Sequence, residues 1–202
     1  MEKIAVIGAG QMGNGIAQVA ASAGYEVLMI DIKQEFVDRG MATIQKSLSK
    51  LVSKERMSQL DADNTLARIS TTTDRSECAD VDLVVEAVPE ILDLKTSIFS
   101  ELDEICKPEC ILASNTSSIS ISTIANATSR PDKVIGMHFM NPVPIMKLVE
   151  IINGDQTSEA TNSAVVGAAE KMGKTALSCN DSPGFISNRI LCPMLNEAIL
   201  TL

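Results

Sequence analysis

The first 31 residues contain a short apolar segment, a glycine-rich turn, a helical segment and a second apolar segment that ends in an acid. Three glycines of the turn GAGQMG have separate uses. Gly8 allows a tight turn, Gly10 lets the backbone approach a phosphate, and Gly13 lets the helix pack closely on a sheet. Asp31 follows Gly10 by 21 residues, the distance at which a second strand brings a carboxylate to a ribose hydroxyl. The pattern predicts a βαβ unit that binds a dinucleotide.

The acid at position 31 also predicts which dinucleotide binds. A carboxylate repels a 2′-phosphate and accepts hydrogen bonds from free ribose hydroxyls, so Asp31 favours NAD over NADP. Ile32 stands where an arginine would hold a 2′-phosphate, and Lys33 is the nearby cation that could weaken the preference. The cofactor contacts expected in the turn are Gly8, Gly10, Gln11, Met12 and Gly13.

Composition excludes several other functions. The net charge of −9 disfavours nucleic acid as a partner, and four Phe, one Tyr and no Trp leave few rings on which bases could stack. No apolar run approaches the roughly 18 residues of a membrane helix, so we expect a cytoplasmic protein. Five scattered cysteines fit reduced thiols. Because His138 is the only histidine and Cys106 and Cys110 have no second pair, we expect no metal.

Apolar runs alternate with helical patterns along most of the chain, which predicts an α/β fold with a doubly wound, mainly parallel sheet. The expected strands are 3–7, 25–30, 68–70, 82–87, 110–114, 134–139, 147–152 and 175–178. The expected helices are 13–24, 35–54, 61–67, 92–105, 119–127, 158–172 and a last one from about 185. Turn residues at 181–184 indicate a linker, so the predicted domains are 1–182 and 183–202.

A histidine and a glutamate stand twelve residues apart, in GMHFMNP and KLVEII. If the intervening loop folds the two strands antiparallel, His138 and Glu150 come almost opposite one another. A carboxylate on one ring nitrogen would leave the other free to exchange a proton with a substrate hydroxyl. The alternative is a structural histidine beside a strand-end glutamate.

Two other segments allow both a functional and a structural interpretation. The hydroxyls of 114–118 (SNTSS) follow a strand, where ligands of open α/β sheets bind, but Ser and Thr also cap helices. Lys46, Lys50 and Lys54 line one face of the helix expected at 35–54. That stripe is either a solvated face or a cationic patch that binds phosphates in an acidic chain.

Five segments together resemble the L-3-hydroxyacyl-CoA dehydrogenase family, closest to its bacterial 3-hydroxybutyryl-CoA dehydrogenases: GAGQMGNGIA, DLVVEAVPE, ASNTSSISI, GMHFMNPVPIMKLVEII and SPGFISNRIL. The resemblance runs over the whole chain. It implies a Rossmann-type sheet with a helical arm, followed by the first helix of an all-α domain. It also implies reversible NAD-dependent oxidation of an L-3-hydroxyacyl-CoA, with 3-hydroxybutyryl-CoA as the expected substrate.

The resemblance assigns roles to particular residues. His138 would be the general base paired with Glu150, with Ser117 on the substrate oxygen and Asn188 near the thioester. Beyond Asp31 and the turn, the cofactor contacts would be Glu90, Lys95, Asn115, Ser117 and Asn141. The coenzyme A contacts would be Ser47, Lys50 and Lys54. It favours the phosphate-binding interpretation of the lysine stripe.

The end of the chain is where we expect a difference from the family. Relatives continue into a helical domain that supplies a dimer contact and closes the cleft, whereas this sequence stops at Leu202. The last helix would present a broad apolar surface that something must cover. We therefore expect a homo-oligomer, and a dimer for a full-length relative.

Two other functions stay open at this point. One is a dehydrogenase of a free hydroxy or sugar acid, which would have no use for the lysine stripe. The other is a non-catalytic NAD-binding protein, for which the pair of His138 and Glu150 would be superfluous.

Overall fold

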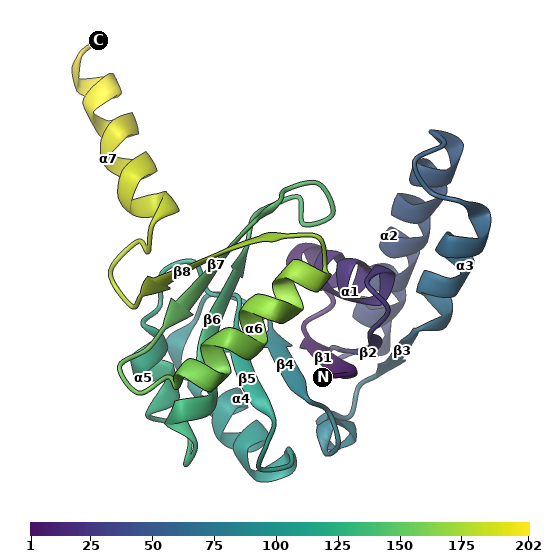
Figure 1. Ribbon diagram of the computed structural model, residues 1–202, viewed down its shortest axis with the longest axis horizontal. Coiled ribbons are helices and arrows are strands. Elements are labelled where there is room, and N and C mark those ends of the chain that lie inside the picture. The colour runs from purple at the N-terminus through teal and green to yellow at the C-terminus, as the bar shows by residue number, and fades with distance from the viewer.

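A single eight-stranded sheet runs through the computed structural model, which describes residues 1–202, with helices on both faces (Figure 1). The strands are β1 (Lys3–Ile7), β2 (Glu26–Ile30), β3 (Ile69–Thr72), β4 (Leu83–Glu86), β5 (Ile111–Ser114), β6 (Val134–Phe139), β7 (Leu148–Asn153) and β8 (Thr175–Asn180). Their order in the sheet is β3-β2-β1-β4-β5-β6-β7-β8. All neighbours are parallel except β6 and β7. The chain therefore winds outward in both directions from β1, as predicted.

The helices are α1 (Gln11–Ser22), α2 (Gln34–Ser53), α3 (Gln59–Ala67), α4 (Leu92–Ile105), α5 (Ile121–Ala125), α6 (Glu159–Lys171) and α7 (Ser187–Leu200). Two short 3-10 helices, η1 (Arg75–Cys78) and η2 (Pro131–Lys133), were not predicted. Figure 1 shows α2 and α3 side by side as an arm at one end of the sheet, and α7 extending away from the other end.

Two apolar cores lie on opposite faces of the sheet. Alternate side chains of β1 enter different cores: Ile4 and Val6 pack with residues of α1, α2 and α6, and Ala5 and Ile7 pack with residues of α4 and α5. Because both faces are covered, the central strands are apolar at nearly every position. This burial explains why continuous apolar runs, and not alternating ones, predict these strands.

The predicted starts of four helices were wrong by two residues; one of them, α3, begins at Gln59 and not at 61. The first helix begins at Gln11, not at residue 13, because Gly10 is its N-cap. The Ser120 side chain accepts a hydrogen bond from Thr123 N–H, so α5 begins at Ile121 and not at 119. The last helix begins at Ser187 because Gly184 and Phe185 have positive φ angles of 81° and 50°. Phe185 buries its ring in the core.

The last helix packs little against the rest of the chain. No residue of α7 is buried, and its exposed large apolar residues are Ile190, Leu191, Met194, Leu195, Ile199 and Leu200. None of the helices is both long enough and apolar enough to cross a membrane.

Candidate functional site

The glycine turn after β1 has the close contacts that its sequence predicts. Gly8 has a φ of 102°, and a Cβ there would lie 2.7 Å from the carbonyl oxygen of Ala87. A Cβ on Gly13 would lie 1.7 Å from the carbonyl oxygen of Gly8, so α1 can approach the turn only without a side chain there. Around Gly10 the space is open. The turn therefore exposes backbone at Gly10 and closes tightly on either side of it.

Asp31 lies just beyond the end of β2 and holds the turn. Its Oδ2 accepts from Ala9 N–H at 2.7 Å, and its Oδ1 accepts from Ile32 N–H at 2.7 Å. Each carboxylate oxygen has further acceptor capacity for a ligand hydroxyl. The side chain is only partly buried. One residue therefore shapes the turn and offers acceptors beside it.

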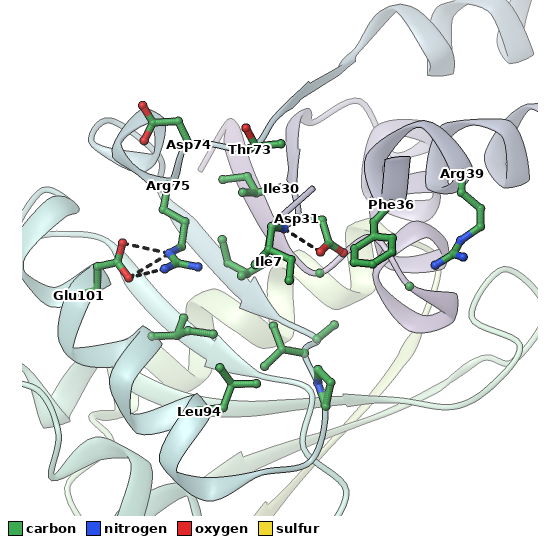
Figure 2. Close-up of a pocket in the computed structure, with 17 residues that line it drawn as sticks. Ile7, Ile30, Asp31, Phe36, Arg39, Thr73, Asp74, Arg75, Leu94 and Glu101 are labelled. Carbon is green, nitrogen blue, oxygen red and sulfur yellow. Dashed lines mark hydrogen bonds and ion pairs between the residues drawn. The ribbon is translucent and has the colours of Figure 1, made fainter. Parts of the chain in front are cut away.

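A cavity of about 610 Å³ opens between the turn and α4. Its walls include Gly8, Gly10 and Asp31 on one side and Val88, Pro89, Leu94 and Ile98 on the other. Figure 2 shows Phe36 and Arg39 at one end, Arg75 and Glu101 at the other, and Asp31 between them. Lys33 does not line this cavity, because its ammonium lies near Glu35 and over the Phe36 ring. Arg39, and not Lys33, is therefore the cation that lines this end of the cavity.

His138 and Glu150 are directly opposite in the antiparallel pair of β6 and β7, as the twelve-residue spacing predicts. His138 Nδ1 lies 2.7 Å from Glu150 Oε2, and both side chains are buried. Because a carboxylate can only accept, the proton of the neutral ring is on Nδ1 and Nε2 keeps its lone pair. The Phe185 ring, 6.0 Å away between centroids, lies beside the imidazole.

Glu150 has further partners beyond His138. Its Oε1 accepts from the backbone N–H groups of Ile186 at 3.0 Å and Ser187 at 2.7 Å, at the start of α7. Burial by itself raises the pKa of Glu150. The hydrogen bonds from Ser187, His138 and Ile186 outweigh that effect and hold the pKa below its ordinary value. The carboxylate is therefore anionic and fixed in position at neutral pH.

The loop after β5 brings Ser117 near two of the other predicted residues. Ser117 N–H donates to Glu90 Oε1 at 3.0 Å, and the Asn188 side chain donates to the carbonyl oxygen of Ser117 at 3.3 Å. Glu90 Oε1 also accepts from Thr116 Oγ1 and from Ser118 N–H. Burial opposes ionisation of Glu90, but these bonds and Lys95 keep its pKa below the ordinary value.

Lys95 lies inside the protein, with only 1% of its surface exposed. Its ammonium donates to Glu86 Oε1 at 2.7 Å and to the Val88 carbonyl oxygen at 3.3 Å, and it lies 3.3 Å from Glu90 Oε2. Glu86 Oε2 in turn accepts from Ser114 Oγ at 2.6 Å. This buried network joins the ends of β4 and β5 to α4, and thereby fixes Glu90.

The remaining predicted cofactor residues lie around the same edge of the sheet. Asn115 Oδ1 accepts from Phe139 N–H at 2.9 Å, which ties the loop after β5 to the end of β6. Gln11 donates to Asn141 Oδ1 at 3.2 Å. The Met12 side chain is partly buried and packs against the core.

A second cavity, of about 440 Å³, lies between the arm and the loop after β6. Lys46, Ser47, Lys50 and Lys54 of the arm line one wall, and residues 141–145 line the other. Arg56 adds a further cation. None of these arm cations has a carboxylate within ion-pair distance. The lysine stripe therefore faces a cavity, and Gln11 and Asn141 line it next to the glycine turn.

Sequence reasoning missed five residues of this region. A glutamate at the end of the apolar run LVVE was the available signal for Glu86. Arg39, Arg56 and the ion pair of Arg75 with Glu101 carried no local signal, because each becomes part of a cavity only through the packing of distant elements.

The mainly parallel sheet, the glycine turn with Asp31 and the buried pair of His138 and Glu150 define a Rossmann-type dehydrogenase. The family described as "3-hydroxyacyl-CoA dehydrogenase, NAD binding domain" matches residues 3–182. The chain therefore belongs to the 3-hydroxyacyl-CoA dehydrogenase family.

Individual relatives cover most of the chain. It is 60% identical over 198 residues to a probable 3-hydroxybutyryl-CoA dehydrogenase of Deinococcus radiodurans, a match that covers 98% of this chain and 70% of that protein. It is 47% identical to the 3-hydroxybutyryl-CoA dehydrogenase of Clostridioides difficile, with the same two coverages. The crystal structure of (S)-3-hydroxybutyryl-CoA dehydrogenase from Ralstonia eutropha superposes with a TM-score of 0.96 at 47% identity, covering 98% of this chain and 70% of that one.

The residues of the first cavity fit NAD. The N-cap of α1 is Gly10, which has no side chain to occupy the N–H groups of the first turn, and that turn has no acidic residue. Free N–H groups at a helix N-terminus bind a pyrophosphate. Asp31 supplies acceptors for the ribose hydroxyls, and the apolar wall opposite suits a purine.

Proposed function

We propose that this chain oxidises a short-chain L-3-hydroxyacyl-CoA, 3-hydroxybutyryl-CoA above all, reversibly to the 3-oxoacyl-CoA, with His138 as general acid/base. The observation that carries the proposal is the buried contact of 2.7 Å between His138 Nδ1 and Glu150 Oε2. The reaction class, an NAD-dependent dehydrogenation, follows from the family to which the chain belongs.

His138 performs the proton transfer in this proposal. NAD, when bound, supplies the hydride acceptor. As the carbinol C–H bond breaks and the C=O bond forms, the hydroxyl proton passes to His138 Nε2. The resulting imidazolium is stabilised by Glu150, whose own position is fixed by two backbone N–H groups. In the reverse direction His138 returns the proton to the oxygen.

Further residues position the reactants. Ser117 would hydrogen-bond the reacting oxygen and Asn188 would contact the acyl thioester; the Asn188 side chain donates to the Ser117 carbonyl oxygen, which holds the two residues together. Around NAD we assign Gly8, Gly10, Gln11, Met12, Gly13, Asp31, Glu90, Lys95, Asn115, Ser117 and Asn141. Lys95 contributes chiefly through Glu90, because its ammonium is occupied inside the protein.

The arm cavity is assigned to coenzyme A. Ser47, Lys50 and Lys54 line it, and Arg56 joins them. With Lys46, the cavity has four cations in a chain with a net charge of −9, and such a cluster suits the phosphates of coenzyme A. A free hydroxy or sugar acid would leave this cavity unused.

We also propose that residues 1–182 form the NAD-binding domain and that 183–202 belong to a separate helical unit. The matched range of the family, 3–182, supports the boundary, as does the exposed apolar face of α7. We further propose that the chain forms a homo-oligomer and that it is located in the cytoplasm.

The test is a steady-state assay of NADH oxidation with acetoacetyl-CoA, and with acetoacetate as the control substrate. We expect turnover with the thioester and at most a trace with the free acid. Equal rates with both substrates would contradict the assignment of the arm cavity. The absence of turnover with either, in a chain that binds NADH, would contradict the catalytic role of His138.

A further inference from the structure

Lys174, the residue before β8, is hydrogen-bonded to the loop that joins β6 to β7. The segment between α6 and β8 runs beside this loop (Figure 1). The Lys174 ammonium donates to the carbonyl oxygen of Val143 and, at 2.9 Å, to that of Met146. No other group of the protein donates to either oxygen. One side chain therefore satisfies two backbone carbonyls of the loop.

The backbone of Lys174 is held in place by the end of α6. Gly173 has a φ of 72°, and its N–H donates to the carbonyl oxygen of Glu170 at 2.9 Å. Lys174 N–H donates to the carbonyl oxygen of Ala169 at 3.1 Å. These two hydrogen bonds form a Schellman motif, in which a glycine ends a helix. The side chain therefore reaches the loop from a fixed point.

The charge of Lys174 has no carboxylate partner, although the chain is acidic. No Asp or Glu oxygen lies within ion-pair distance of its ammonium. The side chain is half-buried, and this burial lowers the pKa of the lysine. A partly buried ammonium needs hydrogen-bond acceptors to offset lost hydration. The loop carbonyls are those acceptors, so the lysine and the loop stabilise one another.

Pro144 and Ile145 of this loop have open space on two sides. They line the arm cavity, and they also line a third cavity of about 390 Å³, which Lys174 borders. Both residues are exposed. Their neighbour Val143 is buried against α1, where a Cβ on Gly15 would lie 2.8 Å from its own Cβ. The position of the exposed segment therefore depends on two anchors, the packing of Val143 and the hydrogen bonds of Lys174.

We propose that Lys174 is a positioning residue for the acyl-CoA substrate, because it holds residues 143–146 as the wall of the arm cavity that faces the lysine stripe. The inference rests on the proposed function, which assigns this cavity to coenzyme A. A wall that is already ordered costs less binding energy than one that the ligand must order. Asn141, at the other end of the loop, is held by Gln11. Binding of NAD should therefore depend little on Lys174.

The experiment measures dissociation constants for acetoacetyl-CoA and for NADH by calorimetric titration of the 202-residue chain, at low and at high salt. Lys174→Met should weaken binding of acetoacetyl-CoA by about five- to twentyfold, since hydrogen bonds from a charged donor are lost. NADH should bind within about twofold of the wild type, because residues 143–146 do not line the NAD cavity. The loss should persist at high salt, whereas attraction between an exposed charge and a phosphate is screened.

Two further variants separate the hydrogen bonds from the charge. Lys171→Met removes a lysine that lines the same third cavity, but whose ammonium lies 4.0 Å from the centroid of the Tyr25 ring and makes no hydrogen bond to the loop. This matched control should leave both dissociation constants unchanged. Lys174→Arg keeps a charged donor and should restore most of the affinity for acetoacetyl-CoA.

Proteolysis tests the loop directly, without any ligand. Lys147 follows the loop and is exposed, so trypsin can cleave after it whenever the loop opens. Cleavage there should be faster in Lys174→Met than in Lys171→Met or the wild type. Equal cleavage rates in all three proteins would show that Lys174 does not hold the loop, and would overturn the inference.

The binding data distinguish failure of this inference from failure of the proposed function. A wild type that does not bind acetoacetyl-CoA overturns both. Binding that Lys54→Glu weakens and Lys174→Met leaves unchanged overturns the inference alone. Equal losses in Lys174→Met and Lys171→Met, or a loss that disappears at high salt, would show that Lys174 acts only through its charge. Loss of NADH binding as well would show that Lys174 supports the whole fold, and would also overturn the inference.

Discussion

Glu150 accepts from His138 through Oε2 and from the N-terminus of α7 through Oε1. The contact with His138 is fixed by neighbouring strands, and the contact with α7 by a turn 36 residues further along the chain. A carboxylate at the N-terminus of a helix is stabilised by the free N–H groups there. The pair of His138 and Glu150 and the start of the last helix therefore depend on one another through this side chain.

His138→Ala should lower kcat for acetoacetyl-CoA reduction by roughly 10² to 10⁴-fold, or about 3 to 5 kcal/mol of barrier, because proton transfer is lost. The dissociation constant for NADH should change little. Glu150→Gln should also lower kcat. If the two residues act as one unit, the double variant falls little below His138→Ala. Fully additive losses would contradict a dyad.

The lowered pKa of Glu150 predicts how stability changes with acid. A carboxyl group with a lower pKa in the folded state stabilises the fold above its unfolded pKa, about 4.3, and loses that contribution as pH falls through the folded value. The wild type should therefore lose stability relative to Glu150→Gln as pH falls from about 5 to 3. Chemical denaturation across this range measures the difference. A difference that does not depend on pH would contradict the prediction.

Asp31→Asn should narrow the preference for NADH over NADPH, because the charge that repels a 2′-phosphate is removed. NADH should also bind more weakly, since Asp31 holds Ala9 N–H in the turn. Dissociation constants for both cofactors test this. A wild type that already prefers NADPH would show that the role assigned to Asp31 is wrong.

Lys50→Glu and Lys54→Glu should each raise KM for acetoacetyl-CoA and spare KM for NADH, because both lysines line the arm cavity and not the NAD cavity. The effect should shrink as salt rises, since charges at exposed sites are screened over about 10 Å at 0.1 M. Lys133→Glu, which lines neither cavity, is the matched control. An equal rise in both KM values would point to a folding defect.

The apolar face of α7 should drive association of the 202-residue chain. Ile190 and Leu195 are 64% and 51% exposed, and burial of such side chains contributes about 1.5 to 3 kcal/mol each. Replacing both by Glu should yield a monomer, while the unsubstituted chain sediments as a larger species. Sedimentation velocity over a range of concentrations tests this, and identical monomers from both would rule it out.

Local sequence was enough to predict those parts of the molecule whose conformation depends on neighbouring residues. The glycines at 8, 10 and 13 and the acid at 31 predicted the turn, because each requirement concerns backbone conformation or a single strand end. Strand and helix order followed from apolar periodicity. The facing of His138 and Glu150 followed from strand geometry once an antiparallel pair was assumed.

Contacts between distant elements were not predictable in the same way. Glu86 meets Lys95 and Ser114 only because β4, β5 and α4 pack together, and no spacing in the sequence encodes that contact. Phe185 also lies where the sequence did not predict it. Its position suggested the start of an amphipathic helix, but a positive φ turns its ring into the core beside His138.

The sequence by itself determined the order of the elements, the dinucleotide turn, the position of the acid at the end of β2, and the facing of His138 and Glu150, because each follows from backbone geometry or short spacings. Only the tertiary structure decided which charges remain free and which are paired. Arg75 is neutralised by Glu101, Lys95 is buried between two glutamates, and the cations of the arm face an open cavity. The physical reason is that pairing and burial depend on distances between residues far apart in the chain, which packing alone determines.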